Sequence, residues 1–205
     1  LLRYLCGLQT PTEGRILVNG IENNAHQIGM VFQQYSSIPW LTVLENVALG
    51  LELQGVPKKE REERAKQMLE TVGLFDHRKK YAKYPTLSGG QLQRVAIARS
   101  LIVNSDILLM DEPFGALDIN TRIKMQELIL EIWEKYGLTI VFVTHDIAEA
   151  VYLSNEIFIM KANPGRIVKR IIPDIGDRNH SVKRSHKFIN TVNDIEDYMK
   201  QISTM

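Results

Sequence analysis

The sequence has one cysteine, no long apolar run and almost no excess of either charge. Cys6 alone cannot form an intrachain disulfide, which suits a reducing compartment. Apolar runs such as Ile107–Met110 and Ile140–Val143 are far shorter than the roughly 18 residues that a membrane span needs. We therefore expect any membrane role to depend on a partner.

The charge balance also disfavours one class of ligand. Lys and Arg number 25 against 24 Asp and Glu, a net charge of +1. A domain that binds nucleic acid through its backbone usually shows a clear basic excess, so no nucleic-acid partner is expected. The length of 205 residues and the 44% hydrophobic composition suit a single domain with one sizeable core.

Strand and helix patterns alternate along the chain. Apolar segments typical of strands lie at 15–18, 28–32, 106–110, 138–143, 156–160 and 166–171. Amphipathic patterns typical of helices lie at 42–53, 60–72, 88–103, 118–136 and 146–153, with a weaker one at 188–202. The strands at 106–110 and 138–143 are apolar on both faces, which places them in the middle of a parallel sheet covered by helices. The fold class is therefore predicted to be α/β.

The alternation also predicts how the chain is divided. The block 34–87 is almost wholly helical, and we interpret it as an inserted helical subdomain. The catalytic core is then formed by 1–33 and 88–172, and 173–205 is a polar C-terminal tail. Within the helical block, Tyr81 and Tyr84 are expected to pack beneath neighbouring lysines.

Two carboxylates follow the apolar strand that ends in Met110. Ligands of open α/β folds bind at the carboxyl edge of the sheet, where Asp111 and Glu112 would lie. Asp111 is placed to hold Mg²⁺, and Glu112 to accept a proton from an attacking water, as phosphoryl transfer requires. The alternative is a solvated strand end with incidental acidic residues.

The segment Leu87–Gln91 opens a helix with a pattern that suits anion binding. Ser88 is a natural N-cap, and Gly89 and Gly90 leave backbone N–H groups uncovered at the positive end of the helix dipole. The alternative is a plain capped helix with a flexible start. The acidic strand end that follows at close spacing favours the anion site.

Five motifs in order resemble those of the ATP-binding-cassette (ABC) ATPases. LSGGQ at 87–91, ILLMDEP at 107–113, GALD at 115–118 and VTHD at 143–146 are similar to the signature motif, Walker B motif, D-loop and H-loop, and IGMVFQQ at 28–34 is similar to the Q-loop. The resemblance covers essentially the whole chain. It implies a P-loop NTPase core with a mainly parallel sheet, a small antiparallel part and an inserted helical subdomain, and it implies hydrolysis of ATP with Mg²⁺.

The resemblance also assigns roles around the hydrolysed phosphate. Gln33 corresponds to the Q-loop glutamine, which approaches Mg²⁺ and the attacking water, while Gln34 is the weaker candidate. Asp111 would bind Mg²⁺ and Glu112 would be the general base. His145 would contact the γ-phosphate and position the water that Glu112 activates.

Further roles concern a second subunit, so a dimer, most simply a homodimer, is implied. The γ-phosphate of ATP held by the other subunit would be contacted by Ser88, Gly89, Gly90 and Gln91. Asp118 would lie at the dimer interface and link the two sites.

One family motif is absent from these 205 residues. The phosphate-binding loop G-x-x-x-x-G-K-[ST] would lie just before a helix that reads like the segment from Leu1 to Leu5. Because that segment has helical spacing and no cap, we expect the chain to begin after this loop, with the first strands and the adenine-stacking aromatic also missing. On this expectation the fragment alone neither binds ATP well nor hydrolyses it.

Two local segments indicate a subgroup within this family. The segments from Tyr35 to Val43 and from Glu45 to Val47 resemble ABC importers of nitrate, sulfonate, taurine and related small anions. This implies a transmembrane permease partner, an indirect link to a periplasmic or lipoprotein solute-binding protein, and a peripheral location on the cytoplasmic face of the membrane. Residues near Tyr35–Leu41 are candidates for the permease contact. Trp40 either belongs to this contact or packs in the subdomain core.

Two other functions are weighed against transport. Non-transport ABC ATPases of DNA repair carry a long coiled-coil insertion, which the stretch between Gln33 and Leu87 lacks, and those of translation carry two cassettes. A non-catalytic binding module is the third possibility. The presence of both Glu112 and His145 argues against it for the parent protein. The transported solute is not encoded in this chain.

Overall fold

The computed structural model describes residues 1–18, 20–22, 28–33 and 36–203. The chain divides into two compact units, Leu1–Val143 and Thr144–Met205. The larger unit holds all the parallel strands of the described residues, and the smaller one holds an antiparallel pair.

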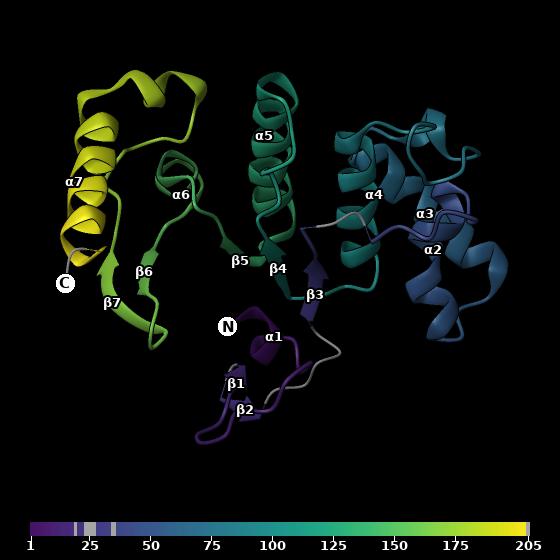
Figure 1. Ribbon diagram of the computed structural model, residues 1–205. Helices are drawn as coiled ribbons and strands as arrows, with labels where there is room; N and C mark the ends of the chain where they lie inside the picture. The colour runs from purple at the N-terminus through teal and green to yellow at the C-terminus, as the bar shows by residue number, and fades with distance from the viewer. Residues whose placement is uncertain (19, 23–27, 34–35, 204–205) are drawn as a thin grey trace. The chain divides into compact units, whose positions relative to one another are not determined.

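A parallel sheet forms the centre of the larger unit. Strands β3 (Ile28–Val31), β4 (Ile107–Asp111) and β5 (Thr139–Val143) are hydrogen-bonded in that order (Figure 1). β4 is central and its Leu108, Leu109 and Met110 are buried, which confirms the α/β prediction and the central place of this strand.

The position of β5 differs from the prediction. Within the described residues β5 pairs only with β4, so it lies at an edge and Ile140, Val141 and Phe142 are only half-buried. A run of apolar residues indicates that a strand is partly buried, but it does not say how many neighbouring strands bury it.

The N-terminal part of this unit contains short elements. Helix α1 (Leu2–Leu5) has no side-chain cap, and β1 (Leu17–Val18) pairs antiparallel with β2 (Ile21–Glu22). The sequence analysis predicted the first of these strands and missed the second. Gly20, with φ +79°, adopts the left-handed conformation that the turn between them needs; Asn19 lies outside the described residues.

Helix α4 (Gly89–Leu101) lies against β3. Its Leu92, Val95 and Ala96 are buried. The two elements approach closely at Gly29, where an added Cβ would lie 3.0 Å from the carbonyl oxygen of Ser100. This helix carries the LSGGQ segment at its N-terminus, so its packing on β3 connects two predicted motifs.

The helices of the block predicted at 34–87 lie within 43–77, and the described residues 36–42 and 78–87 are not helical. Helices α2 (Val43–Leu53) and α3 (Lys58–Thr71) and the short 3-10 helix η2 (Phe75–His77) follow in order, and α2 packs against both α3 and α4. A capping box begins α2, because Thr42 Oγ1 accepts from the Glu45 N–H at 3.2 Å and Glu45 Oε2 accepts from the Thr42 N–H at 2.8 Å. The division into core and subdomain stays a prediction.

Helix α5 (Ile119–Tyr136) is capped by Asp118 and ends at Gly137 in the left-handed conformation. Its buried face consists of Met125, Gln126, Leu128, Ile129 and Ile132. Trp133 and Tyr136, near the C-terminal end of the helix, are 37% and 41% exposed.

The smaller unit begins with α6 (Ile147–Leu153). Strands β6 (Ile157–Lys161) and β7 (Arg166–Ile171) form the predicted antiparallel pair, followed by η3 (His180–Arg184) and α7 (His186–Ser203). α7 packs on α6 and is longer than the predicted 188–202. Among the described residues, no helix is long and apolar enough to cross a membrane.

Candidate functional site

The structure brings together two of the predicted catalytic residues at the carboxyl edge of the sheet. β3 and β4 are parallel and Val31 lies opposite Met110, so the residues that follow each strand meet at one edge. There the side-chain Nε2 of Gln33 donates a hydrogen bond of 2.9 Å to Oε2 of Glu112. Gln34, the weaker candidate, lies outside the described residues.

The backbone of Glu112 is in an unusual conformation. Its φ of +43° falls in the left-handed region, which a glutamate rarely adopts. Two hydrogen bonds hold it: the Glu112 N–H donates to the Val143 carbonyl at 2.9 Å, and the Gly115 N–H donates to the Glu112 carbonyl at 3.3 Å. Such strained residues cluster at functional sites, at a cost of about 1–3 kcal/mol each. The conformation therefore supports a function for Glu112 rather than an incidental acidic strand end.

Asp111 is the last residue of β4 and is half-buried beside Glu112. The described residues contain no cluster of three or more His, Cys, Asp or Glu side chains that could hold a metal by themselves. Mg²⁺ usually takes one or two protein carboxylates and completes its shell with waters and substrate phosphates. One strand-end carboxylate therefore fits a Mg²⁺ ion that arrives with a nucleotide.

The LSGGQ segment begins α4 with a capping box. Ser88 Oγ accepts from the Gln91 N–H at 3.3 Å, and Gln91 Oε1 accepts from the Ser88 N–H at 2.9 Å. The Gln91 Nε2 also lies 3.0 Å from His77 Nε2. Because an amide nitrogen can only donate, His77 accepts through Nε2 and carries its proton on Nδ1. Gln91 thus makes contacts within its own chain that the sequence analysis missed, although the S-x-x-Q spacing indicates the capping box.

Gly90 connects this segment to the start of α5. It is buried, and a Cβ added there would lie less than 3.0 Å from Cγ2 of Thr121. Thr121 is itself fixed to Asp118, with its N–H donating to Oδ1 at 3.0 Å and its hydroxyl donating to Oδ2 at 2.6 Å. These bonds, the hydroxyl bond first, lower the pKa of Asp118 below its ordinary value. The predicted signature and D-loop segments therefore pack together within one chain.

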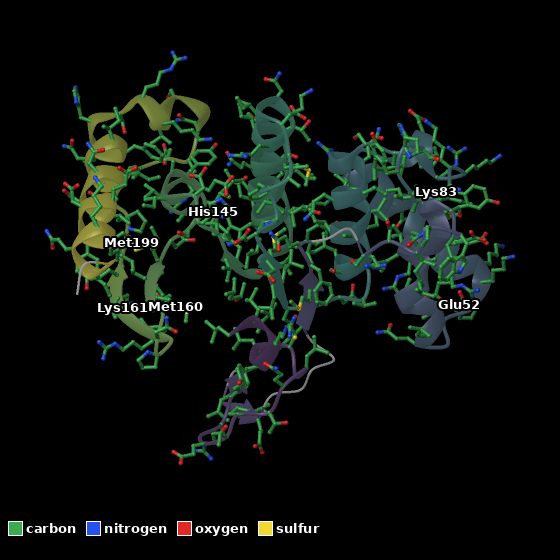
Figure 2. All side chains as sticks on the ribbon, in the orientation of Figure 1. Glu52, Lys83, His145, Met160, Lys161 and Met199 are labelled. Carbon is green, nitrogen blue, oxygen red and sulfur yellow. The ribbon has the colours of Figure 1, made fainter. Side chains whose placement is uncertain are left out.

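His145 is the second residue of the smaller unit (Figure 2), and it is exposed. The turn around it is ordered by its neighbours. Thr144 Oγ1 accepts from the Asp146 N–H at 3.0 Å and donates to Glu149 Oε2 at 2.9 Å, and Asp146 caps α6. The contact of His145 with a γ-phosphate stays a prediction.

The alternative for Trp40 is decided by its exposure. Its side chain is 74% exposed, so it does not pack in the subdomain core. Pro39, Trp40, Tyr81 and Lys83 line a shallow groove of about 410 Å³. Tyr35, at the start of the predicted docking segment, lies outside the described residues.

The prediction that Tyr81 and Tyr84 pack beneath lysines is confirmed only for Tyr81, where Lys83 Nζ lies over the ring at 5.8 Å from its centroid. Neither ring is buried, because Tyr81 and Tyr84 are 53% and 77% exposed. The backbone around Tyr81 pairs with the residues at the start of α2. The Ala82 N–H donates to the Leu41 carbonyl, and the Val43 N–H donates to the Lys80 carbonyl. Neighbouring side chains then alternate, so Ala82 is buried and Tyr81 points outward.

Asn46 is a further residue that the sequence analysis did not single out structurally. It is fully buried in α2, and its Oδ1 accepts from the Ile38 N–H at 2.7 Å. Its Nδ2 lies within hydrogen-bond distance of the carbonyls of Ile38, Leu41 and Thr42, at 3.0, 3.2 and 3.0 Å. One amide therefore holds the loop that presents Trp40.

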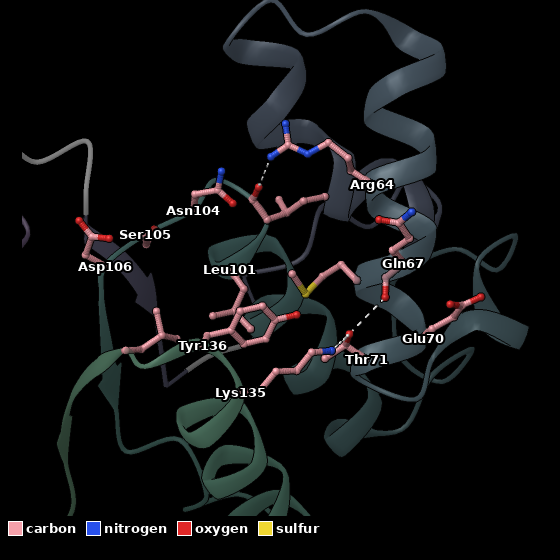
Figure 3. A pocket seen from close by; sticks show the side chains of 13 residues that line it. Arg64, Gln67, Glu70, Thr71, Leu101, Asn104, Ser105, Asp106, Lys135 and Tyr136 are labelled. Atoms are coloured by element: carbon pink, nitrogen blue, oxygen red, sulfur yellow. Dashed lines mark hydrogen bonds between the residues drawn. The ribbon is translucent and has the colours of Figure 1, made fainter.

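A second cavity, larger than the groove at Trp40, lies away from these residues. It has a volume of about 670 Å³ and is lined by parts of α3, the C-terminal end of α5 and the residues that follow α4 (Figure 3). Asp106 and Ser105 on its wall precede β4, so it lies at the sheet edge opposite Glu112. Two hydrogen bonds of 3.2 Å join its walls, from Arg64 to the Ile102 carbonyl and from Lys135 to Thr71 Oγ1.

Comparison with known sequences identifies similar proteins. The family model described as ABC transporter matches residues 1–115. The nitrate import ATP-binding protein NrtD of Synechocystis sp. is 42% identical over 209 residues, covering 98% of this chain and 78% of the relative. The taurine import ATP-binding protein TauB of Pseudomonas putida is 46% identical over 182 residues, covering 87% of this chain and 68% of the relative.

Solved structures agree with this fold. The ATP-binding cassette MJ0796, described as dimeric and bound to ADP and Pi after hydrolysis, matches with a TM-score of 0.72 and 37% identity over 83% of this chain and 78% of that one. The cbiO1 protein of Clostridium perfringens, described as part of an ABC transporter complex, matches with a TM-score of 0.77 and 26% identity over 100% of this chain and 81% of that one.

Proposed function

The chain belongs to the ABC transporter family, as an ATP-binding, ATP-hydrolysing subunit, and from this premise we propose that it powers an importer of small anions such as nitrate, sulfonate or taurine. The names of the nitrate- and taurine-import relatives support this class of solute. The observation that carries the chemistry is the hydrogen bond between Gln33 and Glu112 at the carboxyl edge of the sheet.

Glu112 is the general base in this proposal. It takes a proton from the water that attacks the γ-phosphate of ATP, and the amide of Gln33 orients its carboxylate through the 2.9 Å bond to Oε2. Asp111 and Gln33 would hold Mg²⁺, which supplies neutralisation of the phosphate charge when bound. His145 contacts the γ-phosphate and orients the attacking water.

The signature segment acts on a second copy of the subunit. We place Ser88, Gly89, Gly90 and Gln91 against the γ-phosphate of ATP bound to the partner subunit. The N-terminus of α4, capped by Ser88, carries the positive end of the helix dipole, which favours an anion. Asp118, packed next to this segment through Thr121 and Gly90, then lies at the dimer interface. The dimeric relative bound to ADP and Pi supports this assembly.

The exposed groove at Trp40 docks the permease. An aromatic residue that is 74% exposed beside the segment that carries Gln33 is suited to anchor a partner. Through the permease the subunit would sit on the cytoplasmic face of the membrane and connect indirectly to a solute-binding protein. Closure of the ATPase dimer would then be coupled to the state of the permease.

The test is the Glu112→Gln variant of the complete gene product, assembled with its permease in vesicles. Glutamine keeps the size and can still hydrogen-bond Gln33, but it cannot accept a proton, so we expect hydrolysis to fall about 100-fold or more while ATP binding persists. Uptake of labelled nitrate and taurine should fall with it. Hydrolysis by the variant at the wild-type rate would refute the assignment of Glu112. A wild-type complex that takes up neither nitrate nor taurine when ATP is supplied would refute the solute class.

A further inference from the structure

We propose that Arg99 is a positioning residue for hydrolysis, which together with Ser100 fixes the stretch that carries Gln33 onto helix α4. The proposal rests on the proposed function, because it concerns the orientation of Gln33 toward Glu112. Its structural basis is that two adjacent residues of one helix bind the chain on both sides of Gln33.

The first anchor lies before Gln33. Ser100 Oγ donates to the Met30 carbonyl in β3 at 3.1 Å. The contact is tight, because a Cβ at Gly29 would lie 3.0 Å from the Ser100 carbonyl oxygen and 3.1 Å from Ser105 Oγ. β3 therefore cannot shift along α4 without losing this bond or colliding with the helix.

The second anchor lies after Gln33. Arg99 Nη1 donates to the Ser36 carbonyl at 2.7 Å, and Nη2 donates to Ser36 Oγ at 2.5 Å. The planar guanidinium makes both bonds in one orientation, which a lysine cannot reproduce. Gln33 thus lies between two points, Met30 and Ser36, that are fixed to the same helix.

The energetics make Ser36 the main partner of Arg99. The residue is half-buried, and burial lowers the pKa of its guanidinium. Within the part of the chain that the structure describes, no carboxylate forms an ion pair with it. The two charge-assisted bonds to Ser36 therefore offset the loss of hydration, and removing the guanidinium releases Ser36 rather than a carboxylate.

A matched control exists on the same helix. Arg94 is also half-buried, with a pKa lowered mainly by burial, and its Nη1 donates to a backbone carbonyl, that of Val72, at 2.8 Å. Val72 follows α3 and is not part of the stretch that carries Gln33. Loss of Arg94 should affect stability in a similar way but should not act through Gln33.

The experiment is a double-mutant cycle on ATP hydrolysis by the complete gene product. We expect Arg99→Ala to lower kcat about tenfold or more, with the KM for ATP little changed, because a lost hydrogen bond to a charged group is worth about this factor. In a Gln33→Ala background Arg99→Ala should cause no further loss. Arg99→Lys should recover kcat only in part, and Arg94→Ala should change kcat by the same factor in both backgrounds.

Equal factors for Arg99→Ala in both backgrounds, or no change in kcat, would overturn the proposal. A second measurement does not depend on activity: amide hydrogen exchange over residues 28–33 should rise about tenfold in Arg99→Ala and not in Arg94→Ala. If the wild type does not hydrolyse ATP, the proposed function fails. The exchange result then shows by itself whether Arg99 fixes this stretch, and unchanged exchange would refute it.

Discussion

Gly90→Ala is the substitution whose effect follows most directly from the coordinates. Alanine is the better helix former by about 1 kcal/mol in a helix interior, so helix propensity alone predicts a gain in stability. The added Cβ, however, would lie less than 3.0 Å from Cγ2 of Thr121. The sign of the effect therefore depends on whether Thr121 can move.

Thr121 cannot move without losing an interaction. Its hydroxyl donates to Asp118 Oδ2 at 2.6 Å, and rotating the side chain to withdraw Cγ2 would carry the hydroxyl away. Overpacking of this kind costs about 1–3 kcal/mol, and a lost hydrogen bond costs about 1 kcal/mol. Only part of the propensity gain applies in the first turn, so we expect a net loss of about 1–2 kcal/mol. For a chain of this size that is a fall in Tm of roughly 2–8 °C.

Thermal unfolding followed by circular dichroism measures this shift. The matched variant is Thr121→Ser, which removes the colliding methyl group and keeps the hydroxyl that binds Asp118. In the double variant with Gly90→Ala, most of the lost stability should return. A Gly90→Ala protein as stable as wild type, or a double variant no more stable than Gly90→Ala alone, would refute the reasoning.

Two further predictions concern docking and pH. Trp40→Ala should reduce co-purification of the permease about tenfold or more, with little change in Tm. Leu53→Ala is the control, because Leu53 lies at the other end of α2 and is 80% exposed, and it should leave co-purification unchanged. Unchanged assembly of the Trp40→Ala variant would exclude Trp40 from the interface. The lowered pKa of Asp118 means that its ionised form stabilises the fold. This contribution is present above the unfolded pKa of about 3.9 and is lost as the pH falls through the lower folded pKa. In wild type the urea midpoint of unfolding should therefore fall as the pH drops below about 4, and in Asp118→Asn it should fall less. Identical pH profiles of the midpoint in the two proteins would contradict this.

Features fixed by nearby residues could be predicted from the sequence. The caps at Thr42 and Ser88 depend on partners three residues away, and both capping boxes form. The burial of β4 follows from its continuous apolar run, whereas its central place depends on its pairing with β3 and β5. β2 was missed because two residues carry too little pattern, and the edge position of β5 depends on which strands pair with it.

The candidate site also has parts that could be predicted from the sequence and parts that could not. The meeting of Gln33 and Glu112 at one sheet edge could be predicted, because parallel strands place their carboxyl ends together. The bond from Arg99 to Ser36 joins residues 63 positions apart. No local pattern signals it, since a helical arginine is ordinarily read as a solvated side chain. The exposure of Tyr81 likewise follows from backbone pairing with the residues that begin α2.

The buried amide of Asn46 has a consequence for how tightly Trp40 can be bound. A loop that orders only on binding must lose its conformational freedom at that moment, which weakens the complex. Here the loop from Ile38 to Thr42 is already held by the side chain of one buried residue. Any partner of Trp40 therefore meets an indole whose backbone is ordered in advance, so Asn46 contributes to affinity without touching the partner.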